Sequence, residues 1–185
     1  MIPFVVMITT LFYQREFSGF FMEIYSTYPV SFSWMVIRRI SQTLIVTLMA
    51  HFVWVQVYIW RFKHLQVLIF SKNGLAPVLR EVKWGHLFLE ALPEYLFMIS
   101  ITLFVMIVSK QLFAGLMAGF SYWILESISR GSITKAFTLY VSYLPDDVSY
   151  SSNRTYLFSV AFVVMIVTIL VLNRRERWVV SEEID

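Results

Sequence analysis

The sequence contains no cysteine among its 185 residues, and charged side chains make up only 15% of them. The lack of cysteine excludes a disulfide framework, thiol catalysis and cysteine-ligated zinc. The low charge accompanies 58% hydrophobic and 18% aromatic residues and a mean hydropathy of +0.69, whereas soluble domains are roughly 45 to 50% apolar. The composition therefore predicts an integral membrane protein.

Catalytic and nucleotide-binding motifs are also missing. There is no G-x-x-x-x-G-K-[ST] phosphate loop, no H-E-x-x-H, no nucleophile elbow and no Asp-rich cation motif. Any ATP hydrolysis must therefore take place on another chain, and we do not expect an enzyme. The net charge of +3 comes from Lys and Arg scattered at the ends of apolar segments, so we expect a lipid bilayer and no nucleic acid as partner.

Four apolar segments are long enough to be membrane-spanning helices, because lipid offers the backbone no other partner. They cover residues 40–60, 87–108, 111–128 and 156–172. Residues 1–12 reach only about 18 Å as a helix, and we interpret them as the end of a membrane helix that begins upstream. The predicted fold is an all-α integral membrane protein, one multi-span helical bundle with four full spans and a partial N-terminal one.

An amphipathic segment at residues 14–29 separates two strongly apolar stretches. Its large apolar side chains follow the helical repeat, and its charged and hydroxyl side chains fall largely on the other side. Pro29 then removes a backbone donor and ends the helix. Such a helix lies along a membrane surface, where its polar face can bind a soluble partner or the whole helix can act as a plain anchor.

A second amphipathic run lies before the last span, within residues 129–153. Its apolar residues keep helical spacing until Pro145 stops the pattern: Ile133, Ala136, Phe137, Tyr140, Val141 and Leu144. We expect a short helix that lies at the membrane or dips into it. Residues 61–86, between the first two full spans, contain a Lys-Asn-Gly turn signal.

The features follow one another in a distinctive order. Residues 15–31 read REFSGFFMEIYSTYPVS, and a basic pair, Arg38 and Arg39, then opens a long span. ALPEYLF at 91–97, AGLMAGFSYWIL at 114–125 and NRRER at 173–177 follow. This order resembles the permease subunits of type-2 ATP-binding-cassette (ABC-2) transporters, and the similarity covers nearly the whole chain.

The resemblance implies a six-helix permease of the plasma membrane that works as a pair with a second copy or a paralogue. Residues 14–29 would be the coupling helix that docks into a cytoplasmic ABC ATPase, through Arg15, Glu16, Gly19, Phe20, Glu23, Ser26 and Pro29. This chain would need no cofactor of its own, since ATP and magnesium would bind to the ATPase. The pattern lacks the first helix and half of the second, which implies an N-terminally shortened permease.

The same resemblance places the amphipathic hairpin of residues 129–153 outside and the C-terminus in the cytoplasm, in keeping with the Arg174, Arg175 and Arg177 cluster. An exporter that couples ATP hydrolysis by its partner to substrate translocation is the leading hypothesis. The alternative is a non-transporting membrane scaffold or immunity-type protein that uses residues 14–29 to dock a soluble partner.

Gly115 and Gly119 form a small-xxx-small patch that lets two helices approach closely. The sequence leaves open whether that contact lies within one subunit or between two. The resemblance favours the subunit interface, because the fifth helix of the family lies near it.

Three residues within the spans are candidates for a substrate path. Glu90 and Glu94 share a helix face with His86, and such a set could bind zinc or manganese. A water-facing vestibule is the favoured interpretation, with no metal, because acids inside membranes avoid lipid. His51, near the middle of the first full span, is either a hydrogen-bonded interior histidine or part of the same path.

Overall fold

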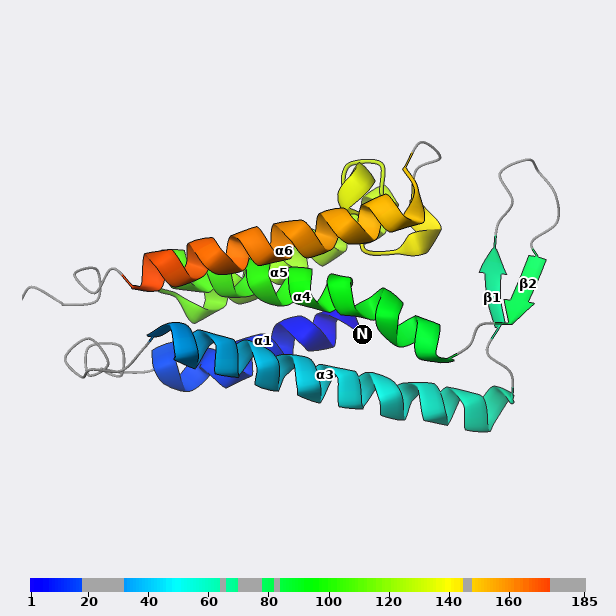
Figure 1. Cartoon of the computed structure of the whole chain (residues 1–185), viewed down its shortest axis with the longest axis horizontal. Coiled ribbons are helices and arrows are strands. Elements are labelled where there is room, and N and C mark those ends of the chain that lie inside the picture. The colour runs from blue at the N-terminus through cyan, green and yellow to red at the C-terminus, as the bar shows by residue number, and fades with distance from the viewer. Residues whose placement is uncertain (18–31, 64–65, 70–77, 82–83, 145–147, 174–185) are drawn as a thin grey trace, which may run out of the picture.

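The structure is a computed structural model, and it describes residues 1–17, 32–63, 66–69, 78–81, 84–144 and 148–173. Its described part is an elongated bundle of five α-helices (Figure 1): α1 (Ile2–Phe17), α3 (Phe32–Phe62), α4 (Trp84–Ser109), α5 (Leu112–Ser129) and α6 (Tyr150–Leu172). Two antiparallel strands, β1 (Gln66–Ile69) and β2 (Val78–Glu81), pair beyond the ends of α3 and α4. The sequence did not predict this strand pair.

Four of the helices are long and apolar enough to cross a membrane: Ser33–Phe62, Leu87–Ser109, Leu112–Ser129 and Tyr150–Leu172. This confirms the predicted helical membrane bundle with four full spans. Trp34 and Trp60 lie near the two ends of α3 and are 67% and 84% exposed. Tryptophan is enriched at membrane boundaries, so these positions fit a helix that crosses the bilayer.

The helices are longer than the apolar segments that predicted them. α3 begins at Phe32 rather than at residue 40, α6 begins at Tyr150 rather than at 156, and α1 continues past residue 12 to Phe17. At the start of α6, the hydroxyl of Ser149 accepts a hydrogen bond from the backbone N–H of Ser152. An N-terminal cap of this kind sets the residue at which a helix begins, independently of hydropathy. An apolar run therefore underestimates helix length.

α4 lies at the centre of the bundle and packs against α6, α5 and α1. In the most apolar stretch of α4, 61% of the residues are buried, against 17 to 22% in the corresponding stretches of the other three spans. Tyr95, Met98, Leu103 and Met106 are among its buried side chains. Pro93 lies inside this helix and has no N–H to donate to the carbonyl four residues earlier.

A tight turn joins α4 to α5. Only Lys110 and Gln111 separate the two helices, and Lys110 adopts the left-handed conformation with φ of 56°. The Ser109 hydroxyl accepts a hydrogen bond from the Gln111 N–H, at 3.3 Å. This turn makes α4 and α5 antiparallel neighbours.

The bundle has two distinct ends. At the end we call the Asn173 end, α1 ends, α3 begins, α4 turns into α5 and α6 ends (Figure 1). There Asn173 Nδ2 donates a hydrogen bond to the Ser33 hydroxyl, at 3.4 Å. At the opposite end, the Tyr150 end, α3 and α5 end, α4 and α6 begin, and the strand pair lies beyond them.

Residues 130–144 do not form the short helix that their apolar spacing predicted. They contain two single 3₁₀ turns, Lys135–Phe137 and Val141–Tyr143. The N–H groups of Leu139 and Tyr140 donate to the Glu126 carboxylate, so they are not available for an α-helical ladder. The prediction was wrong because a carboxylate on α5 competes for these backbone donors.

Candidate functional site

A buried ion pair joins α4 to α6 near the Tyr150 end. Arg154 Nη2 lies 2.8 Å from Glu94 Oε1, and the two side chains are only 9% and 15% exposed. The guanidinium also lies 5.2 Å from the centre of the Tyr150 ring, and its Nη1 donates to the carbonyl of Leu139, at 3.5 Å. Charges inside a membrane protein need such partners, because lipid cannot solvate them.

A second buried carboxylate, Glu126 near the end of α5, organises the loop that follows. Its Oε1 accepts hydrogen bonds from the Thr138 hydroxyl at 2.5 Å, the Leu139 N–H at 2.5 Å and the Tyr140 N–H at 3.1 Å. Three donors that converge on one buried carboxylate oxygen restrict the backbone that carries them. Glu126 therefore fixes the backbone of residues 138–140.

Asn153, beside Arg154 on α6, holds the same loop from the other side. Its Nδ2 donates to the carbonyls of Ala136 and Thr138, at 2.7 and 3.0 Å. We call Glu94, Glu126, Asn153 and Arg154 the polar cluster. Its members lie on α4, α5 and α6, so the cluster joins three helices and the loop of residues 130–144 at one end of the bundle.

Tyr140 connects this loop to α5 through its side chain. The indole N–H of Trp123 donates to the Tyr140 hydroxyl, at 2.9 Å. Burial raises the pKa of the Tyr140 hydroxyl above its ordinary value. This hydroxyl therefore remains neutral at physiological pH.

His51 forms a separate polar contact on the α3 side of α4. Its Nδ1 lies 2.5 Å from the Tyr95 hydroxyl. The imidazole is 9% exposed and contacts Phe88 and Trp54, with ring centres 5.1 and 6.2 Å away. The structure thus places His51 in a hydrogen bond between helices, which is the simpler of the two interpretations drawn from the sequence.

Glu90 borders an open cavity of about 500 Å³ at the Tyr150 end, between α4 and α6. Arg154 and Tyr150 border it from α6. Glu90 is partly exposed, and within the described residues no ion pair or hydrogen bond is formed by its carboxylate. Glu90 and Glu94 therefore lie on the side of α4 that faces α6. His51 belongs to α3 and contacts the opposite region of α4 through Tyr95.

Gly115 and Gly119 pack within the chain rather than at the subunit interface that the resemblance favoured. Both are buried on α5. A methyl group at Gly115 would lie 2.6 Å from the Thr102 carbonyl oxygen, and one at Gly119 would lie 2.7 Å from Val6. The two glycines thus allow α5 to approach α4 and α1 closely.

The proposed coupling residues fall mostly outside the described residues. Arg15 and Glu16 belong to the last turn of α1. The rest of the set, Gly19, Phe20, Glu23, Ser26 and Pro29, lies outside. In the part of the chain that the structure describes, no group of three or more His, Asp or Glu side chains could hold a metal ion.

The sequence reasoning missed Glu126, Asn153 and Arg154. Arg154 precedes the expected last span, 156–172, and so was not considered together with Glu94. Successive spans cross a membrane in opposite directions. The start of the second full span, the end of the third and the start of the fourth therefore lie on the same side. That alternation could have placed Glu94, Glu126 and Arg154 together.

The chain matches no protein-family model, and comparisons with curated proteins and with solved structures find no match either. The functional argument therefore depends on the sequence pattern and on the geometry of the bundle.

Proposed function

We propose that this chain is a membrane-spanning subunit of an ATP-driven transporter of the ABC-2 kind, acting as an exporter in the plasma membrane. The order of sequence features over residues 15–31, 91–97, 114–125 and 173–177 first suggested it. The partners would be a cytoplasmic ABC ATPase, which binds ATP and magnesium, and a second permease copy or a paralogue.

The observation that best supports this proposal is the position of the helix ends that flank residues 18–31. α1 ends and α3 begins at the Asn173 end, where α6 also ends (Figure 1). An ATPase that binds residues 14–29 would therefore face the same side as the C-terminal Arg174–Arg177 segment. In the proposal that side is the cytoplasm, and the Tyr150 end with its polar cluster is outside.

The packing of α1 offers a route for mechanical coupling. α1 contacts the central helix α4 and also α5, and the Tyr13 hydroxyl donates to the Val36 carbonyl of α3, at 3.3 Å. A force applied at the end of α1 would thus reach α3, α4 and α5 together. In the proposed mechanism, closure of the ATPase dimer moves these helices as a body and alternates access to a path between two permeases.

The experiment is to purify the tagged chain from its native membrane and identify the ATPase that accompanies it. Glu23→Lys should weaken this association by about tenfold or more, because a reversed charge at an interface costs several kcal/mol. Lys135→Glu is the matched control, since Lys135 is exposed at the Tyr150 end. The control should leave ATPase association unchanged.

Two results would contradict the proposal. One is co-purification and ATPase stimulation that are equal for both variants and the original chain. The other is a soluble partner that binds residues 14–29 while reconstituted vesicles show no nucleotide-dependent movement of substrate. The second result would favour the non-transporting scaffold instead.

A further inference from the structure

The two side-chain oxygens of Glu126 have very different surroundings. Oε1 accepts hydrogen bonds from Thr138, Leu139 and Tyr140. Oε2 is buried and has no hydrogen-bond partner within the described residues, and the whole residue is 0% exposed. Because water cannot reach the surface of Oε2, a water molecule cannot replace the missing donor.

This asymmetry favours the neutral form of the carboxyl group. In the ionised form both oxygens share the negative charge, so Oε2 would carry part of it with neither a donor nor water beside it. A buried carboxylate without such partners takes up a proton instead. In the neutral acid, Oε1 remains the carbonyl oxygen that accepts the three hydrogen bonds, and the proton resides on Oε2. An unpaired neutral hydroxyl costs far less than an unpaired charge.

The polar cluster contains two carboxyl groups but one cation. Arg154 provides that cation, and its Nη2 lies 2.8 Å from Oε1 of Glu94. Its Nη1 donates to the Leu139 carbonyl, whereas Glu126 accepts from the Leu139 N–H. The guanidinium therefore pairs with Glu94 and is connected to Glu126 through a loop residue, which leaves Glu126 without a cation of its own.

The other titratable groups of the surrounding elements do not supply that cation within the described part of the chain. The charged side chains of the loop and of α1 are exposed or lie at the Asn173 end: Arg130 and Lys135 in the loop, Arg15 and Glu16 in the last turn of α1. Burial lowers the pKa of the Met1 amine, and the carboxylate that acts on this amine is Glu94. The remaining neighbours of the cluster are a carboxyl group and phenols: Glu90, Tyr95, Tyr122, Tyr140 and Tyr150.

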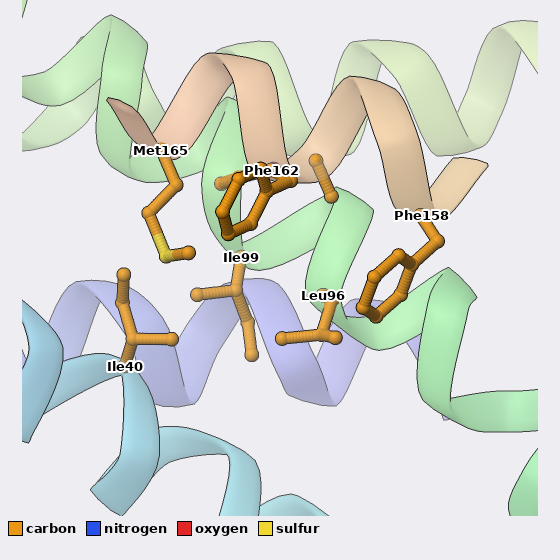
Figure 2. Close-up of a pocket in the computed structure, with 8 residues that line it drawn as sticks. Ile40, Leu96, Ile99, Phe158, Phe162 and Met165 are labelled. Atoms are coloured by element: carbon orange, nitrogen blue, oxygen red, sulfur yellow. The ribbon is translucent and has the colours of Figure 1, made fainter. Parts of the chain in front are cut away.

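The cluster is open toward the Tyr150 end and closed by apolar side chains toward the middle of the membrane. Arg154 and Glu90 border the open cavity of about 500 Å³ at that end. Deeper between α4 and α6 lies a cavity of about 50 Å³, and Figure 2 shows the apolar side chains around it: Ile40, Leu96, Ile99, Phe158, Phe162 and Met165. Its one polar side chain, Ser100, donates to the Phe97 carbonyl of its own helix, at 2.9 Å. A proton can thus reach the cluster from the Tyr150 end, whereas the lining of the deeper cavity offers it no hydrogen-bonded path.

We propose that Glu126 is a proton-binding site, which carries a proton on Oε2 at neutral pH and exchanges it with water at the Tyr150 end. Release of the proton would leave two carboxylates competing for the Arg154 guanidinium. A proton fits better than a metal ion, because Oε2 has no room for a hydrated ion and the described residues contain no group of three or more acidic or histidine side chains that could hold one. The site does not depend on the proposed transport function, since it lies within one chain.

Infrared spectroscopy of the purified chain in detergent tests the bound proton directly. A buried neutral carboxyl group should give a C=O stretching band above the amide region at pH 7, which shifts in heavy water. Glu126→Gln should remove this band. Glu90→Gln is the matched control, because Glu90 is partly exposed, and it should leave the band in place.

Amide hydrogen exchange tests the link between the proton and the loop. Opening of the loop exposes Glu126 to water, where it ionises, so protection at Leu139 and Tyr140 should fall by up to about tenfold for each pH unit above the ordinary range of a glutamate. Glu126→Gln cannot ionise, so its protection factors should lack this fall.

Three results would overturn the proposal. The first is the absence of the infrared band at pH 7 in the original chain, and the second is a band that persists in Glu126→Gln. The third is a Glu126→Gln chain that does not fold, or one whose protection factors depend on pH as those of the original chain do. That result would mean that the site needs the negative charge of Glu126 or that its protonation is not linked to the loop.

Discussion

Two neighbouring residues of α4, Glu94 and Tyr95, show two ways of burying a polar side chain in this bundle. Glu94 pairs with Arg154 of α6, and this pair belongs to a cluster that also binds the backbone of residues 136–140. Tyr95 makes one hydrogen bond to His51 of α3, and aromatic rings surround that contact. The first arrangement is charged and connected to a loop, whereas the second is isolated.

The difference follows from the position of each group and from its partners. Glu94 lies close to the Tyr150 end, where the loop of residues 130–144 supplies carbonyl and N–H groups for the cluster. His51 and Tyr95 meet between two helices whose backbone groups are already used in helical hydrogen bonds. Among the described residues, the buried charges of the polar cluster thus lie where irregular backbone can satisfy them.

Removing one member of the ion pair should have the largest effect on stability. Arg154→Met leaves the Glu94 carboxylate buried without its cation, which should lower the free energy of unfolding by about 3–5 kcal/mol. Thermal unfolding of the purified chain in detergent would measure this. The double variant Arg154→Met with Glu94→Leu should recover most of the loss, since neither charge remains.

A double variant as unstable as the single one would contradict the electrostatic explanation. The stability contribution of Arg154 would then come from packing or from its contact with Leu139.

The connection between cluster and loop can be broken separately. Glu126→Ala removes the acceptor of three hydrogen bonds and leaves the N–H groups of Leu139 and Tyr140 unpaired, which should cost about 2–3 kcal/mol. Amide hydrogen exchange at these two residues should become faster. Glu126→Gln retains an acceptor oxygen and should show a smaller change, and equal exchange rates in all three proteins would be inconsistent with the assigned role.

A change on α5, where this helix packs closely against α4, serves as a comparison that removes no polar side chain. Gly115→Ala places a methyl group 2.6 Å from the Thr102 carbonyl oxygen, and such overpacking should cost about 1–3 kcal/mol. The matched control is Gly85→Ala, because nothing lies within 4 Å of a methyl group there. Equal stability of the two variants would mean that α5 can move away from α4 without cost.

Loss of the hydrogen bond between His51 and Tyr95 should lower the free energy of unfolding least. Tyr95→Phe removes the hydrogen bond to His51 but keeps the ring, so the loss should be about 1 kcal/mol. Thermal unfolding in detergent would measure it against the original chain. A loss as large as that of Arg154→Met would show that His51 and Tyr95 belong to a wider network and would remove the contrast between the two regions.

The four spans could be predicted from the sequence because a helix is the only way for one apolar segment to satisfy its backbone in lipid. The ends of the helices could not, since α6 begins with the polar residues of its first turn and its Ser149 cap rather than with the apolar run. The strand pair of residues 66–81 also escaped prediction, because β1 and β2 are only four residues each and have weak periodicity.

The polar cluster was harder to predict because its contacts join residues far apart in the chain. Glu94 was recognised as a candidate, but its partner Arg154 is 60 residues away. The loop of residues 130–144 has helical spacing, and only the position of Glu126 explains why it forms 3₁₀ turns. Local patterns identify such residues one at a time, whereas their roles depend on how the helices pack.

The tight turn at Lys110 and Gln111 has a consequence for biogenesis. α5 is the least hydrophobic of the four spans and has only 18 residues, whereas α4 is strongly apolar. A linker of two residues leaves α5 no room to remain outside the bilayer once α4 has entered. We expect the two helices to insert as one hairpin, so that α4 supplies the free energy that places Glu126 in the membrane.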